Sequence, residues 1–258
     1  MSAFLEIDGV AKIFGGLTAL DDVSFRLDKA QVLGLVGPNG SGKSTMLNVL
    51  SGVYRPERGQ VMLGGQKLTG LAPSRVASAG VARTFQNLQL FKGLTVGQNV
   101  LVGSNCRMRS TLLGCVFGTP LARREEREAR DKARSLLALV GLEKHFDNEP
   151  SALSYGQRRL LEIARALATA PSVLMLDEPC AGLSQGEADK LAEFIRTLAV
   201  SGMGVIVIEH NMRFVMGLAD HIVVLNFGRK IAEGDPHSIR ENEDVIAAYL
   251  GRRRNAQG

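Results

Sequence analysis

A glycine-rich stretch directly follows an apolar segment near the N-terminus, in QVLGLVGPNGSGKSTML. Gly37, Gly42, Lys43 and Ser44 fit the spacing G-x-x-x-x-G-K-[ST], which chance gives in roughly one chain in a hundred of this length. Glycines let the backbone curl so that successive N–H groups point inward, and a following helix adds partial positive charge. The pattern predicts a phosphate-binding loop made of Gly37, Pro38, Asn39, Gly40, Ser41, Gly42, Lys43, Ser44 and Thr45.

The last residues of this loop suit a nucleoside triphosphate. Lys43 would reach the β- and γ-phosphates, Ser44 would ligate Mg²⁺, and Thr45 would contact the α-phosphate. The alternative is a glycine-rich turn that carries a surface lysine. The apolar strand pattern before the loop and the helical pattern after it favour the phosphate site.

Two acidic residues end a second apolar run, in SVLMLDEP. A buried parallel strand presents side chains at its carboxyl end, where ligands bind in open α/β sheets. Asp177 would hold Mg²⁺ through a water molecule, and Glu178 would orient and polarise an attacking water, as in phosphoryl transfer to water. Taken alone, the pair could equally cap a helix. Beside a phosphate-binding loop, it favours nucleotide hydrolysis.

A third candidate is LSYGQ at 153–157, just before a long helical pattern. Ser154 suits an N-cap, and Gly156 would let a phosphate approach the first helical amides. We expect the helix to bury one stripe made of Leu160, Ile163, Ala164 and Leu167. The segment therefore predicts a second anion site in a chain that already has a complete phosphate loop.

Hydrophobic periodicity divides the chain into three parts. Residues 1–70 contain short alternating runs broken by glycines, which is typical of antiparallel strands. From about 86 to 170 the apolar residues fall at helical spacing, and after 171 strands and helices alternate and end in a hairpin at 226–228. We therefore expect an α/β domain with a mainly parallel sheet, interrupted by a helical insert.

Composition limits the function classes. The chain has 258 residues, with 31 basic and 26 acidic side chains and a pI near 9.3, which is weak support for a nucleic-acid or membrane surface. We expect no nucleic-acid partner. The three cysteines are too scattered for a disulfide framework or a CxxC metal site. No apolar run suits a membrane span, and the start lacks a secretory signal, so we expect a cytosolic chain.

In order along the chain, these motifs resemble those of the ABC ATPases, whose signature LSGGQ corresponds to LSYGQ here. The resemblance implies a P-loop NTPase with a RecA-like core, an antiparallel β subdomain and a helical subdomain, using ATP and Mg²⁺. It implies a head-to-tail dimer in which Ser154, Tyr155, Gly156 and Gln157 of one subunit cover the γ-phosphate held by the other. Phe14 matches the aromatic that stacks on adenine. Gln86 matches a glutamine that senses Mg²⁺ and links to the membrane partner, and His210 matches the switch histidine.

Each of these matches has a simpler alternative. Phe14 could be a core aromatic, Gln86 a surface amide, and His210 an ordinary loop residue. Three positions also depart from the family pattern: Tyr155 replaces a glycine, Ser184 in AGLS stands where many members have aspartate, and Phe14 replaces the commoner tyrosine. Tyr155 would restrict the approach of a phosphate to the amides there, Ser184 would change the cross-dimer contact made by its loop, and Phe14 keeps the aromatic face.

Longer segments, among them RTFQNLQLFKGLTVGQNVLVG and the ending VIAAYLG, resemble the ATP-binding subunit of bacterial branched-chain amino acid importers. The alternatives are importers of urea, amides or aromatic acids, a lipopolysaccharide-export ATPase, an ABC ATPase outside transport, and a binding module without catalysis. The resemblance implies a homodimer or a heterodimer with a second ABC ATPase, permease subunits, indirectly a periplasmic solute-binding protein, and a peripheral place on the cytoplasmic face of the inner membrane. We expect a core at 1–85 and 165–250, a helical subdomain at 86–164 and a basic tail at 251–258.

Overall fold

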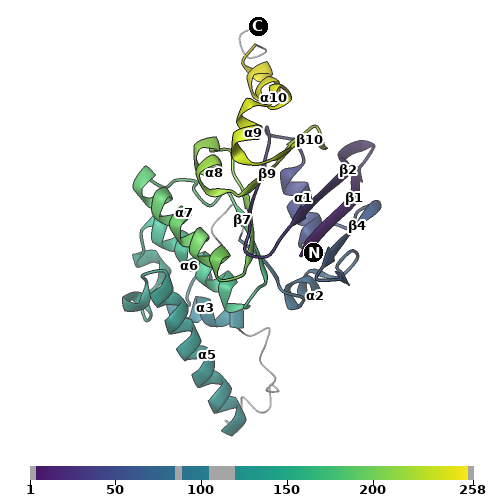
Figure 1. The fold of residues 1–258 in the computed structure, drawn as a ribbon. Helices are drawn as coiled ribbons and strands as arrows, with labels where there is room; N and C mark the ends of the chain where they lie inside the picture. The colour runs from purple at the N-terminus through teal and green to yellow at the C-terminus, as the bar shows by residue number, and fades with distance from the viewer. Residues whose placement is uncertain (1–3, 85–88, 105–119, 255–258) are drawn as a thin grey trace. The chain divides into compact units, whose positions relative to one another are not determined.

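The computed structural model describes residues 4–84, 89–104 and 120–254, which form two compact units (Figure 1). The first, here called the core unit, comprises Met1–Arg83 and Ser172–Gly258, and the second, the helical unit, comprises Thr84–Pro171. The strands and helices of the core unit are β1 (Leu5–Phe14), β2 (Leu17–Leu27), β3 (Val32–Val36), α1 (Lys43–Leu50), β4 (Arg58–Leu63), β5 (Gln66–Lys67), α2 (Pro73–Ser78), β6 (Val81–Arg83), β7 (Val173–Asp177), α7 (Gln185–Val200), β8 (Gly204–Ile208), α8 (Met212–Leu218), β9 (His221–Asn226), β10 (Arg229–Gly234), α9 (Pro236–Glu241) and α10 (Glu243–Arg254).

A six-stranded sheet in the order β10-β9-β3-β8-β7-β6 forms the centre of the core unit. The pairs β9–β3, β3–β8, β8–β7 and β7–β6 are parallel, and β10 pairs with β9 in antiparallel register. Every residue of β3, β7 and β8 is buried, as their unbroken apolar runs predict. Because these three strands are parallel neighbours, their carboxyl ends meet at one edge of the sheet.

The first strands form a separate antiparallel sheet in the order β2-β1-β4-β5, as predicted for residues 1–70. Its apolar side chains, such as Ile7, Phe25 and Val61, join those of β3 and α1 in one hydrophobic core. A second cluster lies under α8, α9 and α10, where Val36 and Val224 contact Val215, Ile239 and Val245. The parallel sheet is therefore covered on both faces.

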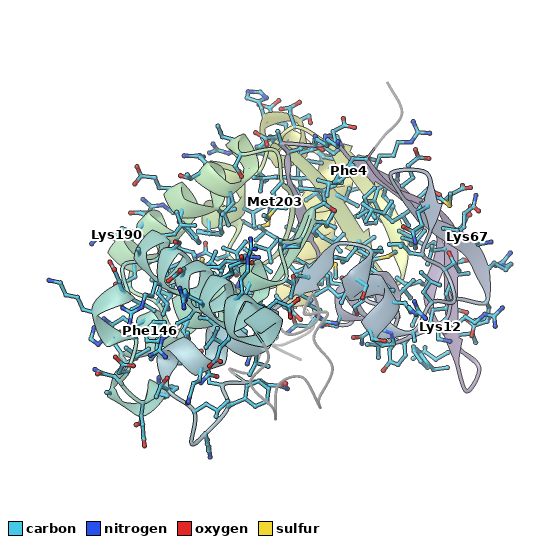
Figure 2. All side chains as sticks on the ribbon, turned by 90° about the horizontal axis from the view of Figure 1, so that it is seen from below. Phe4, Lys12, Lys67, Phe146, Lys190 and Met203 are labelled. Atoms are coloured by element: carbon cyan, nitrogen blue, oxygen red, sulfur yellow. The ribbon has the colours of Figure 1, made fainter. Side chains whose placement is uncertain are left out.

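The predicted hairpin and helices of the C-terminal half are confirmed, with one extension. Phe227 and Gly228 both have positive φ angles, 45° and 79°, which suit the two-residue turn between β9 and β10. Helix α7 buries Ala188 and Leu191, whereas Lys190 points away from the protein in Figure 2. The first four residues of the predicted tail, 251–254, continue α10, and 255–258 lie outside the described residues.

The helical unit contains α3 (Val96–Ser104), α5 (Pro120–Leu139), α6 (Tyr155–Ala168) and two 3₁₀ turns, η2 (Glu143–His145) and η3 (Pro150–Ala152). Helices α3, α5 and α6 pack against one another. Gly141 has a φ angle of 72°, which suits the glycine that follows the last turn of α5. The predicted stripe of α6 is only partly correct, because Leu160 is half-buried while Leu161 and the ion-paired Arg159 and Glu162 are buried. Among the described residues, no helix is long and apolar enough to span a bilayer.

Candidate functional site

The phosphate-binding loop connects β3 to α1. Gly42 is the N-cap of α1 and offers no side-chain acceptor, so the first helical N–H groups are open to an anion. Gly37 needs its missing side chain, because a Cβ there would lie 2.1 Å from the carbonyl oxygen of Leu225 and its φ angle is 149°. Strand β9 therefore fixes the start of the loop.

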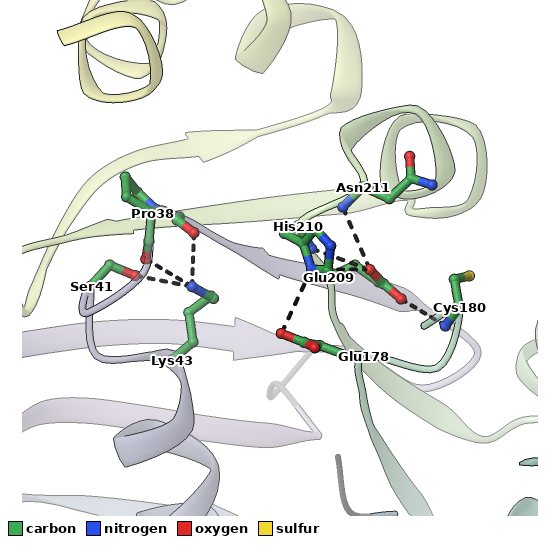
Figure 3. A network of polar contacts seen from close by, with 9 residues as sticks. Pro38, Ser41, Lys43, Glu178, Cys180, Glu209, His210 and Asn211 are labelled. Carbon is green, nitrogen blue, oxygen red and sulfur yellow. Dashed lines mark hydrogen bonds and ion pairs between the residues drawn. The ribbon is translucent and has the colours of Figure 1, made fainter. Parts of the chain in front are cut away.

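Lys43 turns back over this loop, as Figure 3 shows. Its Nζ donates to the carbonyl oxygens of Gly37 at 2.7 Å and Pro38 at 2.9 Å, and it lies 3.5 Å from Ser41 Oγ. Ser44 is exposed and Thr45 is half-buried in the first turn of α1. The structure thus places all nine predicted residues of the loop on one turn and one helix start.

Asp177 ends β7, at the carboxyl edge of the parallel sheet. Its side chain is 8% exposed and accepts from Arg83 Nη2 at 2.9 Å, while Arg83 Nη1 donates to Asn48 Oδ1 at 2.7 Å. The next helix along the chain, α7, starts at Gln185 and is capped by Ser184. The alternative that the Asp177–Glu178 pair caps a helix is therefore excluded.

Glu178 follows in a left-handed conformation, with a φ angle of 48°, which is costly for a residue with a side chain. Its N–H donates to the carbonyl oxygen of Ile208, at the end of β8, at 2.9 Å. His210 comes two residues after Ile208, and its Nδ1 lies 3.6 Å from Glu178 Oε1 (Figure 3). The distance exceeds that of a hydrogen bond. The two predicted catalytic side chains nevertheless face each other across adjacent strand ends.

Phe14 ends β1 and is 38% exposed, so it is not a core aromatic. Tyr54 packs edge-on against its ring with centroids 5.1 Å apart, and Lys12 Nζ lies 5.1 Å from the ring centroid. Lys12 is itself held by Glu57 at 2.7 Å, and this hydrogen bond, with the N–H of Ile13, lowers the pKa of Glu57. Phe14 therefore presents a fixed and accessible aromatic surface, as an adenine platform requires.

The signature segment belongs to the helical unit, where Ser154 caps α6 as predicted. Gln157 N–H donates to Ser154 Oγ at 3.2 Å, and Ser154 N–H donates to Gln157 Oε1 at 2.9 Å, which is a complete capping box. Tyr155 is 39% exposed, and the first turn contains no acidic residue. This helix N-terminus can accept an anion.

Gln86 lies outside the described residues. Two residues that the sequence did not single out do lie at the strand ends: Arg83, which ends β6, and Glu209, which follows β8 and is 1% exposed. The signal for Glu209 was available, since it is an acidic residue after an apolar strand, as Asp177 is. Arg83 carried no comparable signal.

The oxygen donors at this site suit Mg²⁺ only if a bound nucleotide supplies further ligands. Among the described residues, no group of three or more His, Cys, Asp or Glu side chains could hold a metal by itself. Mg²⁺ is usually bound through one or two protein oxygens together with substrate phosphates. The Ser44 hydroxyl and the Asp177 carboxyl group are oxygen donors of that kind, so the residues fit the ion.

Comparison with known proteins agrees with this geometry. The family model for the ABC transporter matches residues 20–181, and the model for the branched-chain amino acid ATP-binding cassette transporter matches 229–254. The chain is 44% identical over 248 residues, 96% of this chain and 97% of the relative, to the high-affinity branched-chain amino acid transport ATP-binding protein BraF of Pseudomonas aeruginosa.

Solved structures give the same result. The ADP conformation of MJ1267, an ATP-binding cassette of an ABC transporter, matches with a TM-score of 0.85 and 33% identity over 97% of this chain and 100% of that chain. The dimeric post-hydrolysis state of the cassette MJ0796, bound to ADP and Pi, matches with a TM-score of 0.75 and 25% identity. This match covers 90% of this chain and 98% of that chain. This chain therefore belongs to the ABC transporter family, as one of its ATP-binding and ATP-hydrolysing subunits.

Proposed function

We propose that this chain powers an importer of branched-chain amino acids. The observation that carries the proposal is the likeness to the Pseudomonas aeruginosa relative, which extends over 96% of this chain. The match at 229–254 supports the same solute class, because that model describes branched-chain amino acid cassettes.

Hydrolysis would use the residues gathered in the core unit. Adenine would stack on Phe14, and the phosphates would lie on the loop amides, with Lys43 Nζ moving from the loop carbonyls to the β- and γ-phosphates. Ser44 and Asp177 would hold Mg²⁺, with Gln86 as a further candidate ligand, and the ion would supply positive charge beside the developing negative charge on the phosphate. Glu178 would polarise the attacking water, and His210 would contact the γ-phosphate.

We further propose that the site is completed by a second subunit. In this arrangement Ser154, Tyr155, Gly156 and Gln157 of one copy, or of a related ATPase, cover the γ-phosphate bound by the other. The capped, acid-free start of α6 supports this role, and the dimeric state of MJ0796 gives a precedent. Because ATP would contact both subunits only in the closed dimer, its binding would favour closure.

The helical unit supplies a docking site for a permease. A cavity of about 350 Å³ is lined by Leu90, Phe91, Lys92, Gly93, Glu149, Pro150, Ser151 and Arg158. Phe91 is 48% exposed, and the Arg165 guanidinium lies 5.4 Å from its ring centroid. An apolar ring beside basic side chains suits a short cytoplasmic segment of a membrane subunit. The chain would then act at the cytoplasmic face of the inner membrane, and a periplasmic binding protein would deliver the solute.

Glu178→Gln tests the catalytic assignment. We expect the variant to bind MgATP, to lose at least about 100-fold in hydrolysis rate and to accumulate as a dimer in light scattering. The matched control is Glu193→Gln on the exposed face of α7, which should hydrolyse ATP normally. A wild-type rate in Glu178→Gln would remove that residue from its assigned role.

The solute is tested separately. The chain is reconstituted with its permeases and binding protein in vesicles, and uptake of radiolabelled leucine is measured with MgATP inside. We expect uptake that unlabelled isoleucine and valine suppress and that urea does not. ATP-driven uptake of urea or an amide in place of leucine would contradict the solute class and leave the ATPase assignment intact.

A further inference from the structure

The carboxyl group of Glu209 joins two loops. Glu209 is 1% exposed, and its Oε1 accepts the N–H of Cys180 at 2.7 Å. Its Oε2 accepts the N–H of His210 at 3.2 Å and faces the N–H of Asn211 at 3.5 Å. Figure 3 shows this carboxyl group between the loop after β7 and the loop after β8. One side chain therefore connects the segments that follow two neighbouring strands.

Burial of the Glu209 carboxyl group is energetically unfavourable unless its oxygens are hydrogen-bonded. Burial of a carboxyl group costs several kcal/mol unless hydrogen bonds offset it, and an apolar side chain would avoid that cost. Within the described ranges, no lysine or arginine forms an ion pair with Glu209, and His210 Nδ1 lies 3.9 Å from Oε2, so the hydrogen bonds that offset the burial come from backbone N–H groups. A glutamine could not replace it fully, because it has one acceptor and one donor where two acceptors are needed.

The two loops carry the residues assigned to hydrolysis. Cys180 lies two residues after Glu178, whose left-handed turn is also held by the carbonyl oxygen of Ile208. Ile208 and Glu209 are consecutive, so the end of β8 holds the Glu178 turn at two successive points. On the other side, Glu209 bonds to the N–H of His210. Glu209 is therefore bonded to both of the loops whose side chains, Glu178 and His210, lie 3.6 Å apart.

We propose that Glu209 is a positioning residue for ATP hydrolysis, which holds the Glu178 turn against the His210 turn through its two carboxyl oxygens. The inference rests on the proposed roles of Glu178 and His210. Among the described residues, Glu209 forms no hydrogen bond or ion pair with the loop at 37–45 or with Phe14, so we expect it to act on the reaction step and to leave nucleotide binding unchanged. A displacement of about 1 Å between two catalytic groups is enough to cost about 100-fold in rate.

The test is Glu209→Gln in the protein assembled with its permeases, with Glu193→Gln as control. We expect kcat to fall about 10- to 100-fold, while KM and the Kd for a fluorescent ATP analogue stay within about twofold. Glu209→Asp, which keeps both acceptors on a shorter side chain, should recover part of kcat. Thermal unfolding verifies that each variant is folded, and if Glu209→Gln is not, Glu209→Asp takes its place in every comparison.

A double-mutant cycle separates positioning from general damage. In the His210→Ala background, measured by single-turnover hydrolysis of radiolabelled ATP, Glu209→Gln should lose at least about fivefold less than in the wild type. An equal loss in both backgrounds, an unchanged kcat, or a parallel loss of nucleotide affinity would overturn the inference. If Glu178→Gln and His210→Ala both hydrolyse normally, the proposed function fails instead. If both are inactive and Glu209→Gln has normal kcat, only this inference fails.

Discussion

Replacement of Gly37 by alanine should damage the phosphate-binding loop through a contact that only the fold reveals. A Cβ at Gly37 would lie 2.1 Å from the carbonyl oxygen of Leu225 and 2.7 Å from Ser41 Oγ. The carbonyl belongs to β9, which pairs with β3 and β10 on its two sides. It cannot turn away without breaking the sheet, so either the loop or the strand must move by roughly 1 Å.

The size of the effect follows from two contributions. Extra atoms forced into a packed site cost about 1–3 kcal/mol, and an unfavourable backbone conformation at a φ angle of 149° adds about 1–3 kcal/mol. Gly40 in the same loop is the matched control, since its φ angle is 79° and a Cβ there would meet nothing within 4 Å. Gly40→Ala should therefore carry only the backbone cost, about 1–2 kcal/mol.

Thermal unfolding without nucleotide distinguishes the two variants. The overpacking cost of about 1–3 kcal/mol is the main difference between the variants, so at about 2–4 °C per kcal/mol for a chain of this size Gly37→Ala should unfold roughly 2–12 °C below Gly40→Ala. Fluorescence titration should also show that Gly37→Ala loses nucleotide affinity, because the loop amides are displaced. Equal melting temperatures for the two variants would refute the claim that β9 fixes the start of the loop.

Three further variants probe the rest of the site. Lys43→Ala should lower nucleotide affinity at least about tenfold in equilibrium titration, because it removes the loop cation; an unchanged Kd would exclude Lys43 from the site. Ser154→Arg should keep ATP binding by the monomer and abolish turnover, and normal turnover would argue against the shared site. Ser184→Ala should cost about 1 kcal/mol in urea unfolding at neutral pH, as loss of an N-cap does. Hydrogen bonds from the Ser184 hydroxyl and N–H lower the pKa of Glu187, so the share of the loss that comes from the hydroxyl–carboxylate bond should fade as the pH falls through the folded-state pKa of Glu187, while the cap bond from the Glu187 N–H to Ser184 Oγ persists.

The parts of the fold that could be predicted from the sequence are those determined by a short, continuous stretch of residues. The strands β3, β7 and β8 are unbroken apolar runs because both of their faces are covered, and such runs are visible in the sequence. Gly141 and Gly228 take positive φ angles where a helix and a hairpin turn need them. The loop at 37–45 was predictable because its glycines, lysine and hydroxyl residues are close together in the sequence and fit one phosphate-binding motif.

The burial of α6 could not be predicted from periodicity. A stripe was expected, but α6 packs against both α3 and α5, so most of its surface is covered. Arg159 and Glu162 look like solvent-facing charges in the sequence, yet each is 1% exposed and they pair at 3.0 Å. Which charges are buried depends on neighbouring helices, and a single helical pattern contains no information about them.

At the carboxyl edge of the parallel sheet, single residues also divide into those that a local pattern predicts and those that depend on neighbouring elements. Lys43, Asp177 and Glu178 were singled out because each belongs to a local motif beside an apolar strand, and His210 because its position matches the switch histidine of the ABC ATPases. Arg83 and Glu209 instead form hydrogen bonds between segments on neighbouring strands. Arg83 bonds to Asp177 because β6 lies beside β7, and Glu209 bonds to the N–H of Cys180 because β8 also lies beside β7. Strand order is a long-range property, since β6 and β7 are separated by the whole helical unit. Candidate ligand-binding residues can thus be inferred from motifs, whereas the residues that connect those motifs can be identified only once the order of the strands is known.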